Sequence, residues 1–556
     1  MRIRKASSLW QGRDESNPDV TAGLLRAQWD GGRLLAFSGL DGSTDFEKGL
    51  VVRTAFGKPG LDVKLPGECR ILFPDLGAME CIVTGDCFIV RGANAELRGA
   101  FLDACHLLIE GPCEARSPDR AITVTTKRNR TLIASASRCE EAKVDADVEG
   151  AIRDRRRWLE TLPLPSTIPA SSRHALLRAV NLMKTQVSTP EGRIRHRWTT
   201  PDRWPHARMW LWDSVFHAIG WRHLDVSVAR DAITAVFDVQ RDDGFMPHMG
   251  SPREISSITQ PPVLAFGVKL VNDVDPRPEW IEALYPKLAA YLEWDVRNRD
   301  TDGAGLVEWA TSGDPHCRCD ESGMDNSPRF DATTSLDAVD FNSFLALEFE
   351  VMSGFAAALG RGADSEKWKG MHSRLCALIR ERFWSERSGF FLDYDNERRT
   401  HSPVLASSGF LPLICGAATE AQAGRLASLL RDPEMFQTRF PVSCIAKSDT
   451  QHYRKDMWRG PVWININWYV ALGLDRYGMA QEAADLRRRT MEEIERFNES
   501  HGVFFEYYDD RREVDPPEMH RKGSCAPEKS PYHQVIHDYG WTATLYADMV
   551  FSCLRG

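Results

Sequence analysis

The sequence of 556 residues contains no run of about 18 apolar residues, so we expect no helix that spans a membrane. Its first residues, MRIRKASSLWQGRDESNPD, include no apolar segment like that of a secretory signal peptide. The 13 cysteines follow no repeated spacing, which favours free thiols over a disulfide framework. These features together predict a cytoplasmic protein without a membrane partner.

Charge of one sign is not concentrated anywhere in the sequence. The 70 Lys and Arg residues are interspersed with 79 Asp and Glu residues, and the net charge is −9. No basic stripe of the kind that binds nucleic acid is present, so no nucleic-acid partner is expected. The composition is that of a globular protein long enough for two or more domains, and it leaves the oligomeric state open.

Metal-binding motifs are also scarce. The segment HCRCDE contains His316, Cys317 and Cys319, but their spacing fits no common zinc pattern and no second cysteine pair follows. We therefore predict no metal site there and no organic cofactor. A calcium ion is compatible with the sequence, although nothing in the sequence supports one.

The pattern of apolar residues divides the chain. Residues 1–140 contain short apolar or alternating segments such as GLVVRTAF and CIVTGDCFIVRG, separated by Gly, Asp, Asn and Pro, which predict a β-sandwich domain. Residues 141–169 combine a charged, helix-prone stretch with LPLPSTIP, which predicts a linker helix and a proline-rich boundary.

Residues 170–556 follow a helical period of about 3.6. About twelve helices without intervening strands predict an (α/α)6 barrel, whose loops would form the catalytic site. After the helix that opens this region near residue 171, they are expected near residues 212–222, 225–239, 260–271, 278–297, 338–360, 364–384, 402–415, 419–430, 461–476, 478–498 and 531–552.

Four loop regions of the helical part join acids or an arginine to aromatic residues and Gly or Pro. Most of the 17 Trp residues lie in this part, and indole rings near carboxylates are typical of sugar recognition, although most should be core residues. Asp213 is compatible with a helix N-cap or a ligand-binding acid, and Asp242-Asp243-Gly244 is typical of a turn. Arg459 is compatible with a structural ion pair.

Two separated carboxylates stand out as a catalytic pair. Asp325 lies in the turn-rich segment ESGMDNSPRFD, and Glu506 lies between aromatic residues in GVFFEYYDD. A carboxylate in that setting is paired, exposed or has its pKa changed by burial. Glycoside hydrolysis needs one carboxyl group to protonate the leaving oxygen and one ionised carboxylate to activate water or attack the sugar.

Five motifs, WLWDSVFH, DGFMPHM, ESGMDNSPRFD, WRGPVWININW and FFEYYDD, together resemble glycoside hydrolase family 63 and its relatives. The family includes processing α-glucosidase and the bacterial mannosylglycerate and glucosylglycerate hydrolases, and the resemblance covers about residues 170–552. It implies an (α/α)6 barrel and an inverting mechanism, with Asp325 as general acid, Glu506 as general base and Asp213 as a sugar ligand. The same motifs, together with the segment EWATSG that precedes ESGMDNSPRFD, supply further candidates for substrate binding. They are Trp212, Asp243, Trp309, Glu321, Asn326, Trp458, Arg459, Gly460 and Trp463.

The predicted function is an exo-acting, inverting α-glycosidase that releases a terminal hexose, expected to be glucose, from a small glycoside or oligosaccharide. Two segments depart from the family pattern, PVSCIAKSD at 441–449 and the polar loop 515–534, and both are expected to reshape the aglycone side. The alternatives are a sugar 2-epimerase using His217 and His248 and a sugar-binding protein without catalysis. A polysaccharide lyase would favour a basic cleft, which the mixed charge does not indicate.

Overall fold

The computed structural model describes residues 29, 31–56, 59–77, 79–314, 316–523 and 534–554. The chain divides into two compact units. The first consists of Met1–Arg208, Ile494–Phe504 and Ile536–Gly556, and the second consists of Met209–Glu493 and Phe505–Val535. The domain limits predicted at residues 140 and 169 both fall inside the first unit.

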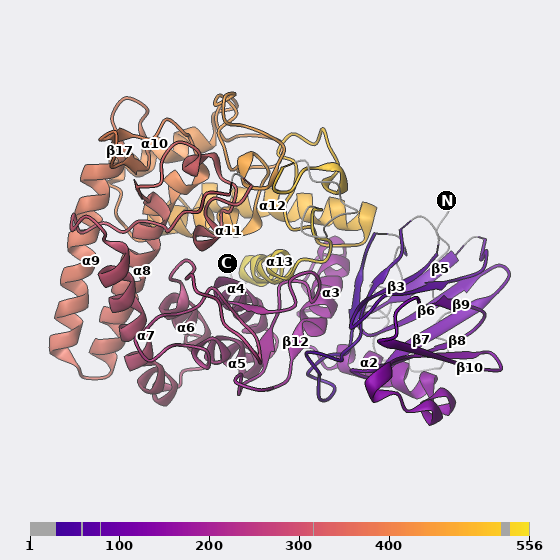
Figure 1. Ribbon diagram of the computed structural model, residues 1–556. Coiled ribbons are helices and arrows are strands. Elements are labelled where there is room, and N and C mark those ends of the chain that lie inside the picture. The colour runs from indigo at the N-terminus through magenta and orange to yellow at the C-terminus, as the bar shows by residue number, and fades with distance from the viewer. Residues whose placement is uncertain are drawn as a thin grey trace. The chain divides into compact units, whose positions relative to one another are not determined.

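The N-terminal part of the first unit is formed by two antiparallel sheets, whose strands lie in the indigo to purple part of Figure 1. One sheet has the order β1-β2-β3-β4-β9, with β1 Leu34–Ala36, β2 Val51–Thr54, β3 Gly60–Leu65, β4 Cys69–Leu72 and β9 Glu114–Arg116. The other has the order β10-β11-β8-β7-β6-β5, with β5 Met79–Val83, β6 Cys87–Gly92, β7 Glu96–Asp103, β8 His106–Glu110, β10 Ile122–Lys127 and β11 Arg130–Ser135.

Residues from both sheets share one hydrophobic core. Leu61 and Ile71 of the first sheet belong to the same buried cluster as Val90 and Leu107 of the second. Trp29 is part of this cluster, and its indole N–H donates to the carbonyl of Gly60 at 2.9 Å. The prediction of a β-rich N-terminal region is confirmed.

The first unit also contains helices. α2 spans Val148–Glu160, and its N-cap, Asp147, accepts a hydrogen bond from the backbone N–H of Gly150. This helix lies within residues 141–169, where the sequence predicted a linker helix. α3, Ala170–Thr185, packs against α13, Gly540–Cys553, so segments from distant parts of the sequence meet here.

The second unit is mainly helical. Short strands such as β14 Met209–Trp210 and β16 Leu336–Asp337 lie between its helices, which corrects the prediction of helices without intervening strands. Its helices are α4 Leu211–Trp221, α5 Val226–Phe237, α6 Leu264–Asn272, α7 Pro278–Arg299, α8 Val339–Ala358, α9 Gly362–Phe383, α10 Glu420–Leu430, α11 Ile464–Arg476 and most of α12 Ala480–His501. They confirm the predicted helical ranges, with two corrections. The range 402–415 forms only the 3-10 helix η5, Ser407–Leu413, which contains Pro412, and the last predicted helix begins at Gly540.

Helix pairing in the second unit follows the apolar pattern. α8 is buried along most of its length, whereas α9 buries a stripe that includes Trp368, Leu375 and Ile379. The two helices lie side by side (Figure 1). A helix buried all round and a partner with one buried face are typical of an inner and an outer helix.

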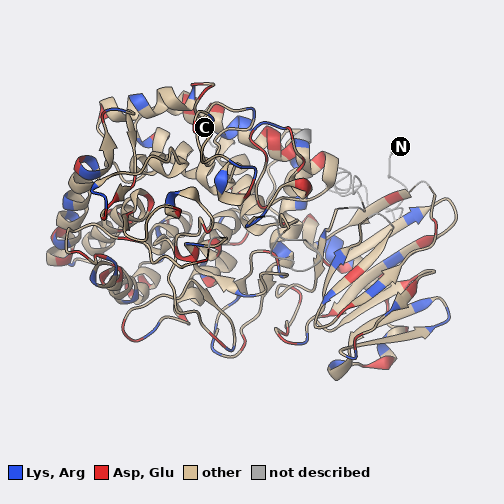
Figure 2. Ribbon diagram, turned by 45° about the horizontal axis from the view of Figure 1, so that its top comes forward, with Lys and Arg blue, Asp and Glu red and all other residues tan. Residues whose placement is uncertain are grey.

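Charges of both signs are interspersed along the ribbon (Figure 2). Within the described ranges, no helix has the length and apolar character needed to cross a membrane. The described cysteines are free thiols, as the sequence predicted.

A buried carboxylate connects α8 to the start of α6. Glu348 accepts hydrogen bonds from the backbone N–H groups of Ala265 and Phe266 at 2.7 and 2.8 Å. These donors lie in the first turn of α6, where backbone N–H groups have no partner within the helix. Burial raises the pKa of Glu348 to about 7, although both N–H groups favour the ionised form.

This shift predicts a pH-dependent contribution to stability. The ordinary pKa is 4.5, so between pH 4.5 and about 7 the folded protein binds more protons at Glu348 than the unfolded chain, and stability falls as pH rises. The difference between the pKa of 4.5 and the pKa of about 7 corresponds to about 3 kcal/mol in the free energy of unfolding. Chemical unfolding at several pH values should therefore show that the free energy of unfolding of Glu348→Gln increases relative to that of the wild type as pH rises through this window. A constant difference between the two proteins would contradict the assignment.

Candidate active site

The segment ESGMDNSPRFD folds into two short 3-10 helices, η3 Asp320–Ser322 and η4 Pro328–Phe330. Gly323, between them, has a φ of 68°, which is unfavourable for residues with a side chain. A Cβ atom at this position would also lie 2.3 Å from the indole ring of Trp212. Glycine is required here both for its backbone conformation and for close approach to the ring.

The same segment is anchored by Arg329, which is buried between two carboxylates. Its guanidinium donates to Asp340 at 2.6 and 2.8 Å and to Asp393 at 2.7 Å through two further bonds. Trp309, a predicted substrate-binding residue, donates its indole N–H to Asp340 and stacks on Phe341 at 3.7 Å. In this structure, Trp309 supports the anchor of the loop.

Glu321 holds the other end of the segment. Its carboxylate accepts two hydrogen bonds from Arg299, at 2.6 and 2.9 Å, and one each from the backbone N–H groups of Thr259 and Ala310. The side chain is buried, and its oxygens connect the loop to the end of α7. A substrate-binding role for Glu321 stays a prediction.

Asp325 lies between these two anchors. Its Oδ2 is 2.8 Å from Nζ of Lys522, and the two side chains are only 17% and 19% exposed. The same ammonium group lies 3.1 Å from Sγ of Cys317 and 3.7 Å from Oδ1 of Asp320. Asp325 is therefore paired with a cation that is itself mostly buried.

Glu506 has a cation of its own. Nε and Nη2 of Arg521 donate to its two oxygens at 2.8 and 3.0 Å, and both side chains are buried. The backbone beside Glu506 is held by two hydrogen bonds between Val462 and Tyr508. Of the interpretations left open by the sequence, the structure supports a carboxylate that is both paired and buried.

Two consecutive residues, Arg521 and Lys522, thus pair with the two catalytic candidates, Glu506 and Asp325. Burial lowers the pKa of the Arg521 guanidinium. The negative charge of Glu506 raises this pKa, and the charge of Asp325 raises it to a smaller extent. Arg521 and Lys522 belong to the polar loop 515–534, whose residues 524–533 lie outside the described ranges. Sequence reasoning missed both residues, because adjacent cations in a polar loop carry no signal of distant carboxylates.

The tryptophans of the motifs form a buried aromatic row. Trp458 and Trp463 stack at 3.9 Å with an angle of 4° between their planes, and Trp212 lies 6.5 Å from Trp458. Tyr507 continues the row, 5.0 Å from Trp463. The row therefore connects three of the five motifs.

Asn326 joins the acid-bearing loop to this row. Its Oδ1 accepts from the backbone N–H of Trp458 at 3.0 Å, and its carbonyl accepts from Nη1 of Arg459 at the same distance. Arg459 also forms an ion pair with Asp331, and this is the kind of structural pair with which the sequence was compatible. A Cβ atom on Gly460 would lie 2.3 Å from the carbonyl of Arg454, so the motif requires glycine at this position.

Two acids differ in their surroundings. The N-cap interpretation of Asp213 is wrong, because α4 begins at Leu211 with Trp210 as its N-cap. Asp213 is buried in the first turn, where the helix dipole favours a negative charge. Asp243 is exposed, accepts from the backbone N–H of Phe245 and pairs with nearby Arg241, which confirms the turn. These contacts do not connect Asp243 to Asp325 or Glu506.

The histidines offered for the epimerase alternative are not suited to acid–base work at neutral pH. Burial lowers the pKa of His217 to about 3 and that of His248 to about 4. An imidazole of this kind stays neutral near pH 7. The lowered pKa values therefore argue against His217 and His248 as an acid–base pair.

Among the described residues, two groups of side chains place metal-ligating atoms within 4.8 Å of one another. The first, Cys317, Asp320 and Asp325, surrounds the ammonium group of Lys522, which already supplies a cation. The second consists of Asp302, Glu308 and Asp337, whose oxygen atoms suit a hard cation such as Ca²⁺.

A hollow of about 360 Å³ adjoins the catalytic candidates. Asn326, directly after the acid, and Gly523, directly after Lys522, both line it. The other lining residues are His316, Arg318, Asp331, Asp456 and Arg459. This position makes the hollow a candidate for the aglycone.

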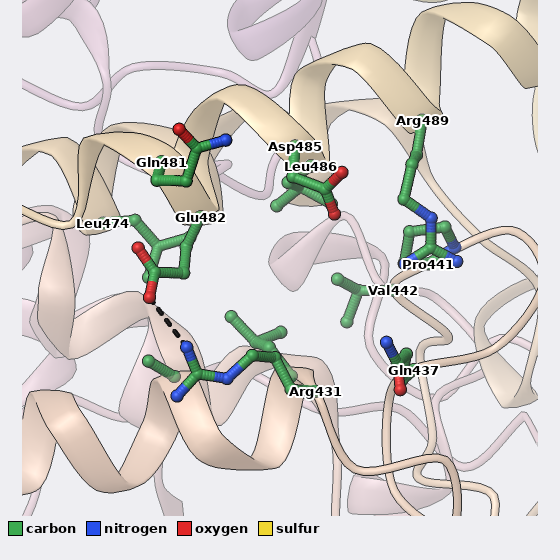
Figure 3. Close-up of a pocket in the computed structure, with 12 residues that line it drawn as sticks. Arg431, Gln437, Pro441, Val442, Leu474, Gln481, Glu482, Asp485, Leu486 and Arg489 are labelled. Atoms are coloured by element: carbon green, nitrogen blue, oxygen red, sulfur yellow. Dashed lines mark hydrogen bonds and ion pairs between the residues drawn. The ribbon is translucent and has the colours of Figure 1, made fainter.

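Another pocket lies between α10 and α12, where Arg431 and Glu482 form an ion pair at 2.7 Å (Figure 3). Its walls include Leu474, Val442 and Leu486. Neither Asp325 nor Glu506 lines it, so we do not place the chemistry there.

Comparison with known proteins identifies the family. A model of the mannosylglycerate hydrolase MGH1-like glycoside hydrolase domain matches residues 205–542, which is more than half of the chain. The protein belongs to this family of glycoside hydrolases. The match includes all five motifs and both catalytic candidates.

Individual family members support this assignment. Mannosylglycerate hydrolase of Thermus thermophilus is 28% identical over 408 residues, which cover 57% of this chain and 92% of that protein. Glucosylglycerate hydrolase of Mycolicibacterium hassiacum is 23% identical, with 56% of this chain and 87% of that protein covered. The resemblance to glycoside hydrolase family 63 and its relatives is confirmed.

Solved structures agree. The family 63 mannosylglycerate hydrolase from Thermus thermophilus in complex with glucose has a TM-score of 0.54 at 26% identity, and covers 66% of this chain and 98% of that chain. A bacterial glucoamylase complexed with acarbose has a TM-score of 0.59 at 10% identity, with 96% of both chains covered. The second comparison shows a likeness of fold alone.

The anchor of the acid-bearing loop can be tested by Arg329→Met. This change leaves two buried carboxylates without their cation, so we expect the free energy of unfolding to fall by at least roughly 3–5 kcal/mol. Urea unfolding measures it. The matched control is Arg488→Met, because Arg488 pairs with Glu492 on the surface and its loss should cost less than about 1 kcal/mol. Equal losses in the two variants would show that Arg329 is not an anchor.

Proposed function

We propose that the protein is an exo-acting, inverting α-glycosidase that releases a terminal hexose from a small glycoside with an acidic aglycone. The observation that carries this proposal is the pair Asp325 and Glu506, each held by its own cation from one loop. Membership of the glycoside hydrolase family supports a hydrolytic role for the pair.

The two carboxylates have different tasks in this mechanism. Arg521 donates to both oxygens of Glu506 and fixes their orientation, so that Glu506 can remove a proton from an attacking water. Asp325 gives a proton to the glycosidic oxygen as the aglycone leaves. In the same step, water attacks the face opposite the leaving group and gives a proton to Glu506, and the anomeric configuration is inverted.

We propose an (α/α)6 barrel as the catalytic fold and a β-sandwich before it. The buried α8 beside the half-buried α9 supports the barrel, and the shared core of the two sheets supports the sandwich. Likeness to a family 63 structure supports the barrel further.

The sugar would lie against the tryptophan row, next to Asp213. The indole N–H of Trp458 is buried and has no hydrogen-bond partner in the described structure, so a sugar hydroxyl would satisfy it. Relatives named for mannosylglycerate and glucosylglycerate support mannose or glucose as the hexose and a carboxylate-bearing aglycone.

The first experiment follows stereochemistry. If Glu506 activates water, an α-linked substrate gives the β-anomer of the free sugar as the first product. Proton NMR in the first minutes of hydrolysis distinguishes the two anomers. An α-anomer as the first product would mean a retaining mechanism and would overturn the assignment of Glu506 as a base.

The second experiment separates the acid from the base. Fluoride leaves without a proton, so Asp325→Asn should lose about 10²–10⁴-fold in kcat/KM on an α-glycoside and much less on the matching α-glycosyl fluoride. Glu506→Gln should be poor on both substrates, because water must be activated in each case. If Glu506→Gln is the variant that spares the fluoride, the two roles are reversed.

A further inference from the structure

Arg203, in the first unit, is a buried cation that pairs with no carboxylate of the described residues. The residue is only 8% exposed. Within the described ranges its guanidinium makes one hydrogen bond, in which Nη1 donates to Oγ of Ser188 at 2.5 Å. Burial lowers the pKa of Arg203 to about 10, and no neighbouring charge raises it. The side chain is therefore still charged at neutral pH, although buried charges are normally paired.

The chain around Arg203 holds this cation in place. The backbone of Arg203 has a φ of 62°, which is unfavourable for a residue with a side chain. The carbonyl of Pro201 accepts from the backbone N–H of Gly540 at 2.7 Å and from Nε2 of Gln186 at 2.6 Å. The carbonyls of both residues that flank Arg203 accept from the guanidinium of Arg53. The position of Arg203 is thus fixed by contacts on each side of it.

The guanidinium lines a small hollow. Most of the other walls are apolar or aromatic and include Phe46, Val51, Leu65 and Trp198. The hollow has a volume of about 20 Å³. This volume suits a single particle of about the size of water and leaves no room for a polyatomic anion such as phosphate.

The lining offers donors and no competing negative charge. Oγ of Ser188, which also lines the hollow, accepts from Arg203, so its own hydroxyl proton can be donated to a bound ion. Asp45 is the acid of the lining, but its carboxylate accepts from the backbone N–H of Lys48 at 2.8 Å and pairs with Arg138 at 3.3 Å. Asp45 is not among the groups that change the pKa of Arg203.

We propose that Arg203 and Ser188 bind a single halide ion, chloride in ordinary solution, in this hollow. A water molecule would accept from the N–H groups but would leave the buried positive charge without an opposite charge. A halide ion supplies that charge, fits the small volume and tolerates the apolar walls. The site involves neither Asp325 nor Glu506, so the inference is independent of the proposed function.

Bromide tests the site directly, because it replaces chloride and scatters X-rays anomalously. Crystals of the wild-type protein grown in sodium bromide should show an anomalous peak within hydrogen-bond distance of the guanidinium of Arg203 and of Oγ of Ser188. The absence of a peak at this place would overturn the proposal. So would a peak no higher than those beside exposed arginines, which would mean an adventitious ion only.

Thermal unfolding tests the site in solution. When sodium gluconate is replaced by sodium chloride at constant ionic strength, the Tm of the wild type should rise by about 2–4 °C, because the ion binds the folded state alone. Gluconate is too large for the hollow. Arg203→Met should lose this rise, whereas Arg203→Lys retains a positive charge and should keep part of it.

Arg33 provides the matched control. It belongs to the same unit, is 6% exposed and lines another hollow of about 20 Å³. Burial lowers the pKa of Arg33 as well, but the charge of Asp538, which lines the same hollow, raises it. Because Arg33 has an opposite charge nearby, Arg33→Met should keep the wild-type response to chloride even where its Tm is lower.

The response to chloride decides the matter separately from any loss of stability. If chloride raises the Tm of Arg203→Met as much as that of the wild type, Arg203 does not bind the ion and the proposal is overturned. Loss of the response in both arginine variants would equally overturn it, because the effect would then not be specific to this hollow. If Arg203→Met does not fold, the bromide peak of the wild type decides alone.

Discussion

The candidate active site depends on the burial of Arg329 between Asp340 and Asp393. Four hydrogen bonds fix the guanidinium to the start of α8 and to a distant segment, and the backbone N–H of Val339 donates to the same Asp393. A buried charge of this kind is stable only when every partner is present. The loop therefore has one low-energy position, and Asp325 shares that position.

Around this anchor, the two candidate carboxylates are held by cations of different character. Glu506 and Arg521 form a buried ion pair with two hydrogen bonds, and the forked guanidinium fixes the orientation of the carboxylate. The ammonium group of Lys522 is a point charge that lies 2.8 Å from Asp325 and also lies near Cys317 and Asp320. This difference agrees with the different tasks proposed for the two carboxylates.

The sequence predicted most of the helices well, because an apolar period survives in tertiary packing. It failed in the range 402–415, where a short 3-10 helix contains Pro412, and at the last helix, which begins at Gly540 rather than near residue 531. The motifs identified Asp325 and Glu506 because their residue types match the chemistry. They did not reveal that Glu321 and Trp309 have partners within the fold. Arg521 and Lys522 were missed because only folding brings their loop to the carboxylates. Pairing across such sequence distances leaves no local pattern.

The most direct test of the account is a crystal structure of the wild-type protein with a thio-linked analogue of an α-hexosyl glycerate, which binds without being hydrolysed. The account predicts a water hydrogen-bonded to Glu506 on the face of the sugar opposite the sulfur, with Asp325 beside the sulfur. A Glu506 oxygen in direct contact with the anomeric carbon, with no room for water, would contradict the central claim.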